Sequence, residues 1–198
     1  CALIQCGLAV LYEAQGSGGG SERSLHREGP SPVGAGKKRV SIMAYPSPYA
    51  LPPQAFREDA WFAAEQRWVF GANWNFVAHA SALAAPGSYR VVQVGRDSLV
   101  LVRDQRGVLR AFHNLCRHRG APLKEGAGRC ASLTCPYHRW SFGLDGRLRG
   151  VPQAEAFPDL DREALGLFPA AVGEWHGLLF AHPDPEPAQT LEAALAGT

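Results

Sequence analysis

Two short stretches of the sequence decide the fold: CRHRG at residues 116–120 and CPYHRW at residues 135–140. Each stretch supplies one cysteine and one histidine, and the four residues are Cys116, His118, Cys135 and His138. Thiolate and imidazole side chains are the ligands that zinc and iron–sulfur centres use in proteins. The two stretches therefore predict a metal centre that these four side chains bind.

The way in which the ligand types are divided between the two stretches separates the candidate metals. A usual zinc finger takes both cysteines from one knuckle and both histidines from another, whereas here each stretch gives one of each. A 2Fe–2S cluster with two inequivalent irons explains this pattern, because both cysteines can hold one iron while both histidines hold the other. A structural zinc module with the same ligands is the alternative, beside a coincidence of two Cys/His pairs in loops.

The residues around the two stretches predict short strands. Runs rich in β-branched residues, separated by turn-forming residues, occupy 90–94, 98–102 and 108–112. Asp145-Gly146 lies between two further runs and is a strong signal for a tight hairpin, and GLLF at 177–180 predicts the last strand. Upstream, apolar residues between Phe56 and Phe70 recur at helical spacing and predict an amphipathic helix.

Longer segments around the two stretches resemble a known family. C-x-H followed, after residues 119–134, by C-x-x-H among short strands resembles the Rieske 2Fe–2S domain. AFHNLCRHRGAPL at 111–123 and CPYHRWSFGLDGRL at 135–148 are similar to the N-terminal part of the large (alpha) subunit of Rieske non-haem iron oxygenases. The resemblance extends from about Phe56 to Pro183. It is nearest to members that oxidise quaternary amines or remove their methyl groups.

The resemblance implies a mainly β fold, an antiparallel Rieske-type domain with two cluster-binding loops, preceded by a short helical arm. We divide the chain into four segments on this basis: a leader, the helical arm, the Rieske domain, and a linker toward a catalytic domain outside this chain. Their bounds are 1–42, 43–80, 81–183 and 184–198. The leader is rich in Gly, Ser and Pro, so we expect it to be disordered. We expect native translation to start at Met43, and a genuine flexible tail is the alternative.

The resemblance also implies a function in electron transfer. It makes Cys116, His118, Cys135 and His138 the ligands of a 2Fe–2S cluster that takes one electron at a time from a reductase or a ferredoxin. In the family the electron passes to a mononuclear non-haem Fe(II) in a separate catalytic domain, where two histidines and a carboxylate hold the iron. We therefore expect part of an oxidoreductase of the monooxygenase or dioxygenase type. We expect no catalytic residue in this chain, and a homo-oligomer, which in the family is a trimer.

The remaining histidines are not assigned to the catalytic iron. They are His26, His79, His113, His176 and His182.

The leading interpretation of the chain is therefore the Rieske part of an amine-oxidising or aromatic-ring-hydroxylating oxygenase large subunit. A free-standing Rieske ferredoxin, which is an electron carrier and not an enzyme, is the alternative. Such a carrier needs neither the helix near residues 56–70 nor the residues after Pro183, so both favour the oxygenase.

Composition and charge exclude other classes of protein. The formal net charge of +2 over 198 residues is small, which argues against nucleic-acid and membrane-surface binding. No stretch reaches the roughly 18 apolar residues of a membrane span. The five cysteines are an odd number and unevenly placed, unlike the dense framework of a secreted disulfide scaffold. A reduced, cytoplasmic location fits them better.

Individual loop residues carry further expectations. Arg139 stands where the family usually has glycine, so it either adds positive charge near the cluster or crowds the loop. Ala121 and Tyr137 occupy positions at which respiratory Rieske proteins have a disulfide, so no such bridge is expected. Cys130 is expected to be a buried small hydrophobe. The loop arginines either steer an acidic partner or brace the loops, and they are Arg117, Arg119 and Arg139.

Overall fold

The computed structural model describes residues 51–196. The predicted leader, 1–42, lies outside the described residues, as do the first residues of the predicted arm. The helical elements are η2 (Pro53–Phe56), α2 (Asp59–Glu65), the π-helix η3 (Gln66–Phe70), η4 (Ala80–Leu83), η5 (Ala154–Ala156) and α3 (Leu191–Leu195). None of the helices in this part of the chain has the length and apolar character needed to cross a membrane. Of the described residues, 51–64 belong to one compact unit and 65–196 belong to another.

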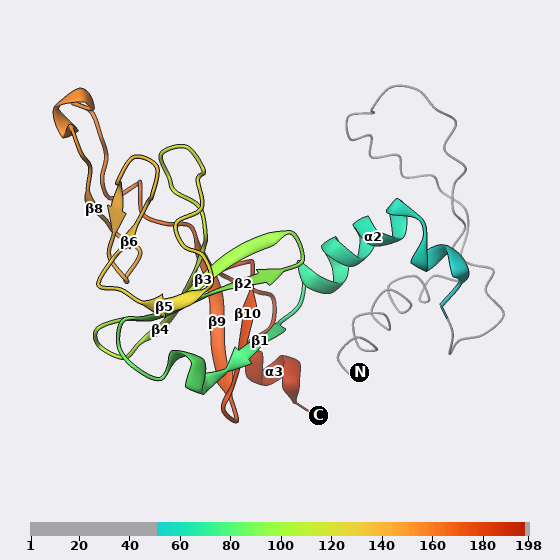
Figure 1. Cartoon of the computed structure of the whole chain (residues 1–198). Coiled ribbons are helices and arrows are strands. Elements are labelled where there is room, and N and C mark those ends of the chain that lie inside the picture. The colour runs from blue at the N-terminus through green and yellow to red at the C-terminus, as the bar shows by residue number, and fades with distance from the viewer. Residues whose placement is uncertain (1–50, 197–198) are drawn as a thin grey trace, which may run out of the picture. The chain divides into compact units, whose positions relative to one another are not determined.

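The second unit is built on antiparallel strands (Figure 1). Its strands are β1 (Asn75–His79), β2 (Ser88–Val94), β3 (Asp97–Arg103), β4 (Leu109–His113), β5 (Ala127–Arg129), β6 (Leu133–Thr134), β7 (Ser141–Phe142), β8 (Leu148–Gly150), β9 (Pro169–Trp175) and β10 (Leu178–His182). One sheet has the order β1-β10-β9-β4-β3-β2-β5 and the other the order β6-β7-β8, with every pair antiparallel. The predicted mainly antiparallel β fold is confirmed.

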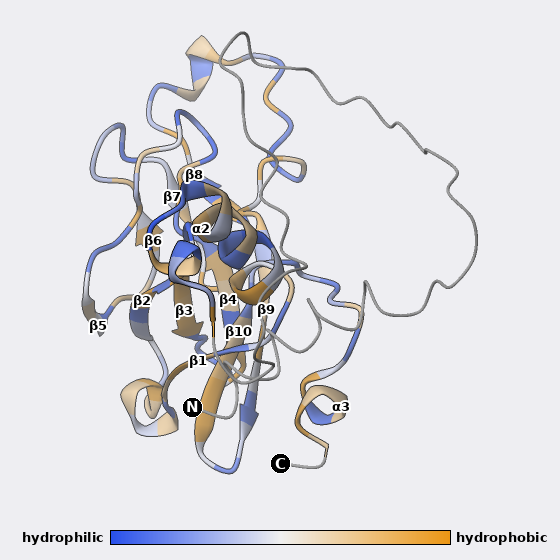
Figure 2. Cartoon of the chain, turned by 90° about the vertical axis from the view of Figure 1, so that its right-hand side faces the viewer, coloured by the Kyte–Doolittle hydropathy of each residue, from blue (hydrophilic) through white to orange (hydrophobic). Residues whose placement is uncertain are grey.

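Strand β3 explains why the sequence carries an unbroken apolar run at its centre. Leu99 and Leu101 belong to one hydrophobic cluster, with strands β4, β9 and β10. Val100 belongs to the other cluster, with the residues around the two Cys/His stretches. Successive side chains of a strand point to opposite faces, so the central part of β3, residues 99–102, is buried on both faces and needs apolar residues at each position. Figure 2 shows hydrophobic colour along strands such as β3.

The small sheet positions the second Cys/His stretch. Strand β6 pairs with β7, and the stretch 135–140 connects them. Leu133 and Phe142 face each other across this pair and are fully buried. The predicted hairpin at Asp145-Gly146 follows, joining β7 to β8 with Gly146 at a φ of 83°. The second stretch is therefore a tight loop on a hairpin whose base is fixed in the core.

Two elements lie within segments to which the sequence analysis assigned a different structure. Strand β1 falls within the predicted helical arm, 43–80, but pairs with β10 at the edge of the large sheet. Helix α3 falls within the predicted linker, 184–198, where TLEAALAG at 190–197 favours a helix by residue type, and its buried Leu191 and Leu195 pack against Phe180 of β10. Both depend on contacts with β10, which local periodicity does not reveal.

Candidate metal centre

The two Cys/His stretches lie in separate loops of the second unit (Figure 1). The first loop, 114–126, runs from the end of β4 to β5, and the second, 135–140, joins β6 to β7. Cys116 and Cys135 belong to the same hydrophobic cluster as Leu123 and Trp140. The sequence-predicted ligands are therefore anchored in one core although they come from different sheets.

Both loops have the same backbone hydrogen bonds. In the first, the Cys116 N–H donates to the Ala121 carbonyl at 2.8 Å, and the Gly120 N–H donates to the Cys116 carbonyl at 2.8 Å. In the second, the Cys135 N–H donates to the Trp140 carbonyl at 2.8 Å, and the Arg139 N–H donates to the Cys135 carbonyl at 3.2 Å. Each cysteine thus begins the same tight turn, whether its histidine follows two or three residues later.

The fifth residue of each turn adopts the left-handed conformation. Gly120 has a φ of 72° and Arg139 a φ of 61°. This conformation costs a residue with a β-carbon about 1–2 kcal/mol, while glycine adopts it freely. Arg139 therefore forms the same kind of turn as Gly120 although it carries a β-carbon. It takes the conformation that the turn requires, at the cost of backbone strain.

The two thiols are buried and close together. Cys116 is 2% exposed and Cys135 is 1% exposed, and neither forms a disulfide. Burial raises the pKa of the Cys116 thiol above its usual value, the backbone N–H groups of His118 and Arg119 lower it, and the neighbouring Cys135 thiol raises it further. The Cys116 thiol therefore resists deprotonation in the absence of a cation. Because metals bind cysteine as the thiolate, metal binding here releases protons.

The two imidazoles also meet. The ring centroids of His118 and His138 are 4.7 Å apart, with an angle of 67° between the planes. Nδ1 of His118 is buried and has no hydrogen-bond partner. Burial lowers the pKa of His118, and the nearby His138 and Arg119 lower it further. His118 is therefore neutral at pH 7, which is the form that binds a metal.

Aromatic rings hold the imidazoles in place. Trp140 stacks on His118 with centroids 4.8 Å apart, and Phe157 meets His118 edge-on at 6.1 Å. Tyr137 stacks on His138 at 3.7 Å and is 63% exposed. No sequence pattern indicates Phe157 as a site residue, because it follows η5, far along the chain from either loop.

The four side chains fit a cluster with two protein ligands on each iron. Among residues 51–196, no group of three or more His, Cys, Asp or Glu side chains could hold a single metal ion. A structural zinc site needs four side chains converging on one point. A pair of neighbouring thiols and a pair of neighbouring imidazoles instead match the two irons of a Rieske cluster, whose other ligands are sulfides. The unpartnered Nδ1 of His118 is the atom that such a cluster would engage.

Asn114 fixes the first loop from within. Its Nδ2 donates to the Lys124 carbonyl at 2.9 Å and to Oγ of Ser98 at 3.2 Å. Its Oδ1 accepts the N–H groups of Leu123, at 3.1 Å, and Lys124, at 3.0 Å. The side chain is buried, so it joins both ends of the loop to β3 without competition from water.

The three loop arginines differ in their contacts. Arg117 donates to the Gly166 carbonyl, and its guanidinium carbon lies 3.8 Å from the centroid of the Phe168 ring. It therefore braces the loop, which was one of the two expectations. Arg119 and Arg139 are exposed.

The other predicted non-ligands lie apart from these pairs. His79 contacts Ser81, His113 contacts the Pro183 carbonyl, and His182 accepts the N–H of Asp184. His26 lies outside the residues described. Cys130 is only half-buried, and burial raises the pKa of its thiol.

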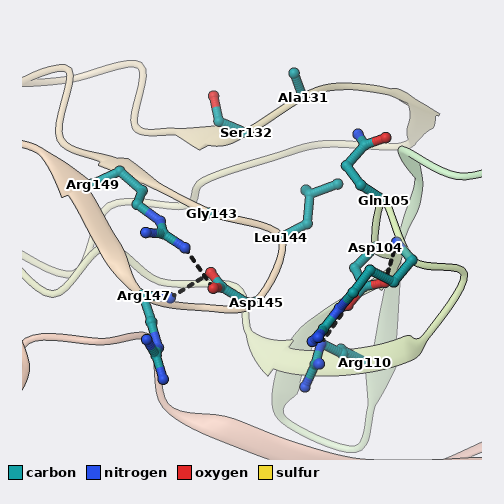
Figure 3. A pocket seen from close by; sticks show the side chains of 11 residues that line it. Asp104, Gln105, Arg110, Ala131, Ser132, Gly143, Leu144, Asp145, Arg147 and Arg149 are labelled. Atoms are coloured by element: carbon teal, nitrogen blue, oxygen red, sulfur yellow. Dashed lines mark hydrogen bonds and ion pairs between the residues drawn. The ribbon is translucent and has the colours of Figure 1, made fainter.

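A pocket elsewhere in the domain contains none of the candidate ligands (Figure 3). Four of its charged residues form two ion pairs, Asp104 with Arg110 at 3.0 Å and Asp145 with Arg149 at 2.6 Å. Burial pulls the pKa of Asp104 upward. Hydrogen bonds from the Val108 N–H, from Arg110 and from the Arg106 N–H outweigh that effect and hold the pKa below its usual value. The buried carboxylate thus stabilises the turn after β3.

Comparison with known proteins identifies the domain. The family described as the Rieske [2Fe-2S] domain matches residues 73–167. The glycine betaine monooxygenase oxygenase subunit of Chromohalobacter salexigens is 41% identical over 133 residues, covering 67% of this chain and 30% of that protein. The chlorobenzene dioxygenase subunit alpha of Cupriavidus sp. is 34% identical over 134 residues, which again cover 67% of this chain and 30% of that protein.

A solved structure agrees. The crystal structure of the quaternary ammonium Rieske monooxygenase CntA in complex with L-carnitine superposes with a TM-score of 0.68 at 36% identity, covering 73% of this chain and 41% of that one. The chain therefore spans less than half the length of these relatives.

Proposed function

We propose that the chain is the electron-transferring part of an oxygenase large (alpha) subunit. The support is that it contains a Rieske [2Fe–2S] domain homologous to that of such subunits. Its homologues are oxygenase subunits, which favours this role over a free-standing ferredoxin. Rieske oxygenases also carry a non-haem iron in a catalytic domain. We place that iron outside residues 51–196, in a part of the protein corresponding to the remaining length of the relatives.

We assign the ligands by pairs. Cys116 and Cys135 hold one iron, and His118 and His138 hold the other. The observation that carries this assignment is the pairing itself: two buried, neighbouring thiols, and two imidazoles 4.7 Å apart, one with a buried and unpartnered Nδ1. When bound, the cluster would accept and release one electron at a time, at a potential raised by its neutral histidine ligands.

The protein's own residues prepare this site. Burial of Cys116 and Cys135 keeps water from the sulfur ligands. Trp140 and Phe157 hold the ring of His118 at a fixed angle, so that its Nδ1 faces the interior. The second ring nitrogen of a metal-binding histidine is free to donate a hydrogen bond to a partner group. His118 and His138 are therefore the residues through which we expect the cluster to contact the next component.

The substrate proposed for the whole protein is a quaternary ammonium compound. The support is that a glycine betaine monooxygenase subunit is 41% identical, whereas a chlorobenzene dioxygenase subunit is 34% identical. We propose that the electron donor is a reductase or a ferredoxin, and that the complete subunit assembles into a homo-oligomer, which in the family is a trimer. The described cysteines are free thiols, which suits the reducing cytoplasm as the location.

Metal analysis and an absorption spectrum of the purified chain test the proposal. We expect two irons and two acid-labile sulfides per chain, and a coloured protein that a chemical reductant bleaches. Cys135→Ser is expected to lose the cluster and much of the stability, because metal-binding energy is also folding energy. Cys130→Ser is the matched control and is expected to keep both. A colourless protein containing one zinc would support the structural zinc module instead.

A further inference from the structure

We propose that Arg139 is kept in a strained backbone conformation because its positive charge raises the reduction potential of the cluster. The inference rests on the proposed function, since it assumes that Cys135 and His138 bind a 2Fe–2S cluster. Arg139 acts here as a positioning residue that holds a charge beside the ligands, not as a ligand itself.

The two turns are equivalent in their backbone geometry. The same pair of backbone hydrogen bonds closes each one, and the fifth residue of each is left-handed. In the first turn this residue is Gly120, around whose missing β-carbon no atom lies within 4 Å. Glycine is therefore present there for its conformation and not for lack of space. By the same reasoning, glycine would suit position 139 better than arginine does.

No side-chain contact of Arg139 among the described residues offsets the backbone strain. Among the described residues, the guanidinium group of Arg139 has no hydrogen-bond or ion-pair partner, and the residue is exposed. Its backbone N–H bond to Cys135 would be made equally well by glycine. What arginine adds at this position is its charge.

The effect of Arg139 on the cluster is electrostatic. Arg139 follows the candidate ligand His138 directly, and reduction adds one negative charge to the cluster. A cation near that charge stabilises the reduced form, and an exposed site weakens this effect without removing it. Residues in rare backbone conformations cluster at functional sites, where the surrounding structure enforces them.

Three variants separate the charge from the strain. Arg139→Lys keeps both the charge and the strained backbone. Arg139→Gln loses the charge but keeps the strain. Arg139→Gly loses both. Two controls complete the set: Arg106→Gln removes an exposed arginine from the turn after β3, and Gln153→Gly relieves strain at another left-handed residue, which has a φ of 55°.

The test measures the reduction potential and the rate of unfolding in urea for each cluster-loaded variant. In Arg139→Gln and Arg139→Gly, we expect the equilibrium with a redox dye to shift toward the oxidised cluster by about two- to fivefold at low salt. Arg139→Lys and both controls are expected to keep the wild-type potential. Arg139→Gly and Gln153→Gly are expected to unfold roughly three- to tenfold more slowly, whereas Arg139→Gln is not.

Equal potentials in wild type, Arg139→Gln and Arg139→Gly would overturn the proposal, as would faster unfolding of Arg139→Gly. Absence of a cluster from the wild-type chain would be a different failure, because it removes the proposed function on which the inference rests.

Discussion

The indole of Trp140 lies flat against the imidazole of His118, with ring centroids 4.8 Å apart and planes 7° from parallel. Trp140 is only 4% exposed, and its carbonyl accepts the hydrogen bond that closes the second turn. One residue of the second loop therefore orients a candidate ligand of the first. The two loops are therefore joined through this stack.

Removing the stack is expected to loosen the site. We predict that Trp140→Ala lowers the free energy of unfolding by about 3–5 kcal/mol, as is usual for a buried large aromatic residue, and lowers the cluster content of the purified protein. Trp140→Phe keeps a ring against His118, so it is expected to keep most of the cluster. Iron content and urea denaturation measure both effects. Full cluster content in Trp140→Ala would mean that the stack does not position His118.

The first loop is expected to depend on Asn114. Asn114→Ala removes four hydrogen bonds and leaves the N–H groups of Leu123 and Lys124 without their acceptor. Because each unsatisfied buried group costs about 1–3 kcal/mol, we predict a loss of that size or larger. Ser98→Ala removes only one of the four bonds and serves as the control. Denaturation curves that coincide for the two variants would contradict this role of Asn114.

Asp104 is expected to make the stability of the folded protein sensitive to acid. Its pKa is lowered in the folded protein, so its ionised form stabilises the fold above the unfolded pKa of about 3.9. This contribution is lost as the pH falls through the lower, folded value. Asp104→Asn should therefore cost most stability near pH 7, about 1–3 kcal/mol, and nothing at the acid end.

Asp145→Asn is the matched control for this prediction. Asp145 pairs with Arg149 at 2.6 Å, but the two side chains are 30% and 58% exposed, so the pair is expected to contribute less than about 1 kcal/mol. Thermal unfolding of both variants across pH measures the difference. An Asp104→Asn penalty that did not change with pH would show that lost packing, and not the charge, is responsible.

Local patterns were sufficient to predict part of this structure. The four candidate ligands were identified by residue type and spacing, because metal coordination restricts both. The strands near β3 were predicted from an apolar run that the structure explains by burial on both faces. The Asp145-Gly146 hairpin was predicted because its turn needs a residue such as Gly146, with a φ of 83°.

Long-range contacts were not predictable in the same way. Strand β1 and helix α3 both depend on β10, which is distant in sequence from β1 and is not implied by the composition around α3. Phe157 reaches His118 from the segment after η5, and nothing near either loop indicates it. The contact of Arg117 with Gly166 and Phe168 is of the same kind. The residue type of Arg117 indicates a positive charge in the loop, but it does not predict which groups the guanidinium contacts.

The most direct test of the central claim, that two histidines bind the cluster, is the reduction potential of the purified chain measured from about pH 6 to pH 11. Reduction makes the iron less positive, so a histidine on that iron holds its outer proton more tightly in the reduced state. At lower pH the proton is bound in both states and the potential is flat. At alkaline pH reduction takes up a proton, and the potential is expected to fall by about 59 mV per pH unit for one proton and one electron. A cluster held by four cysteines has no such titrating ligand, so a potential independent of pH over the whole range would contradict the assignment of His118 and His138.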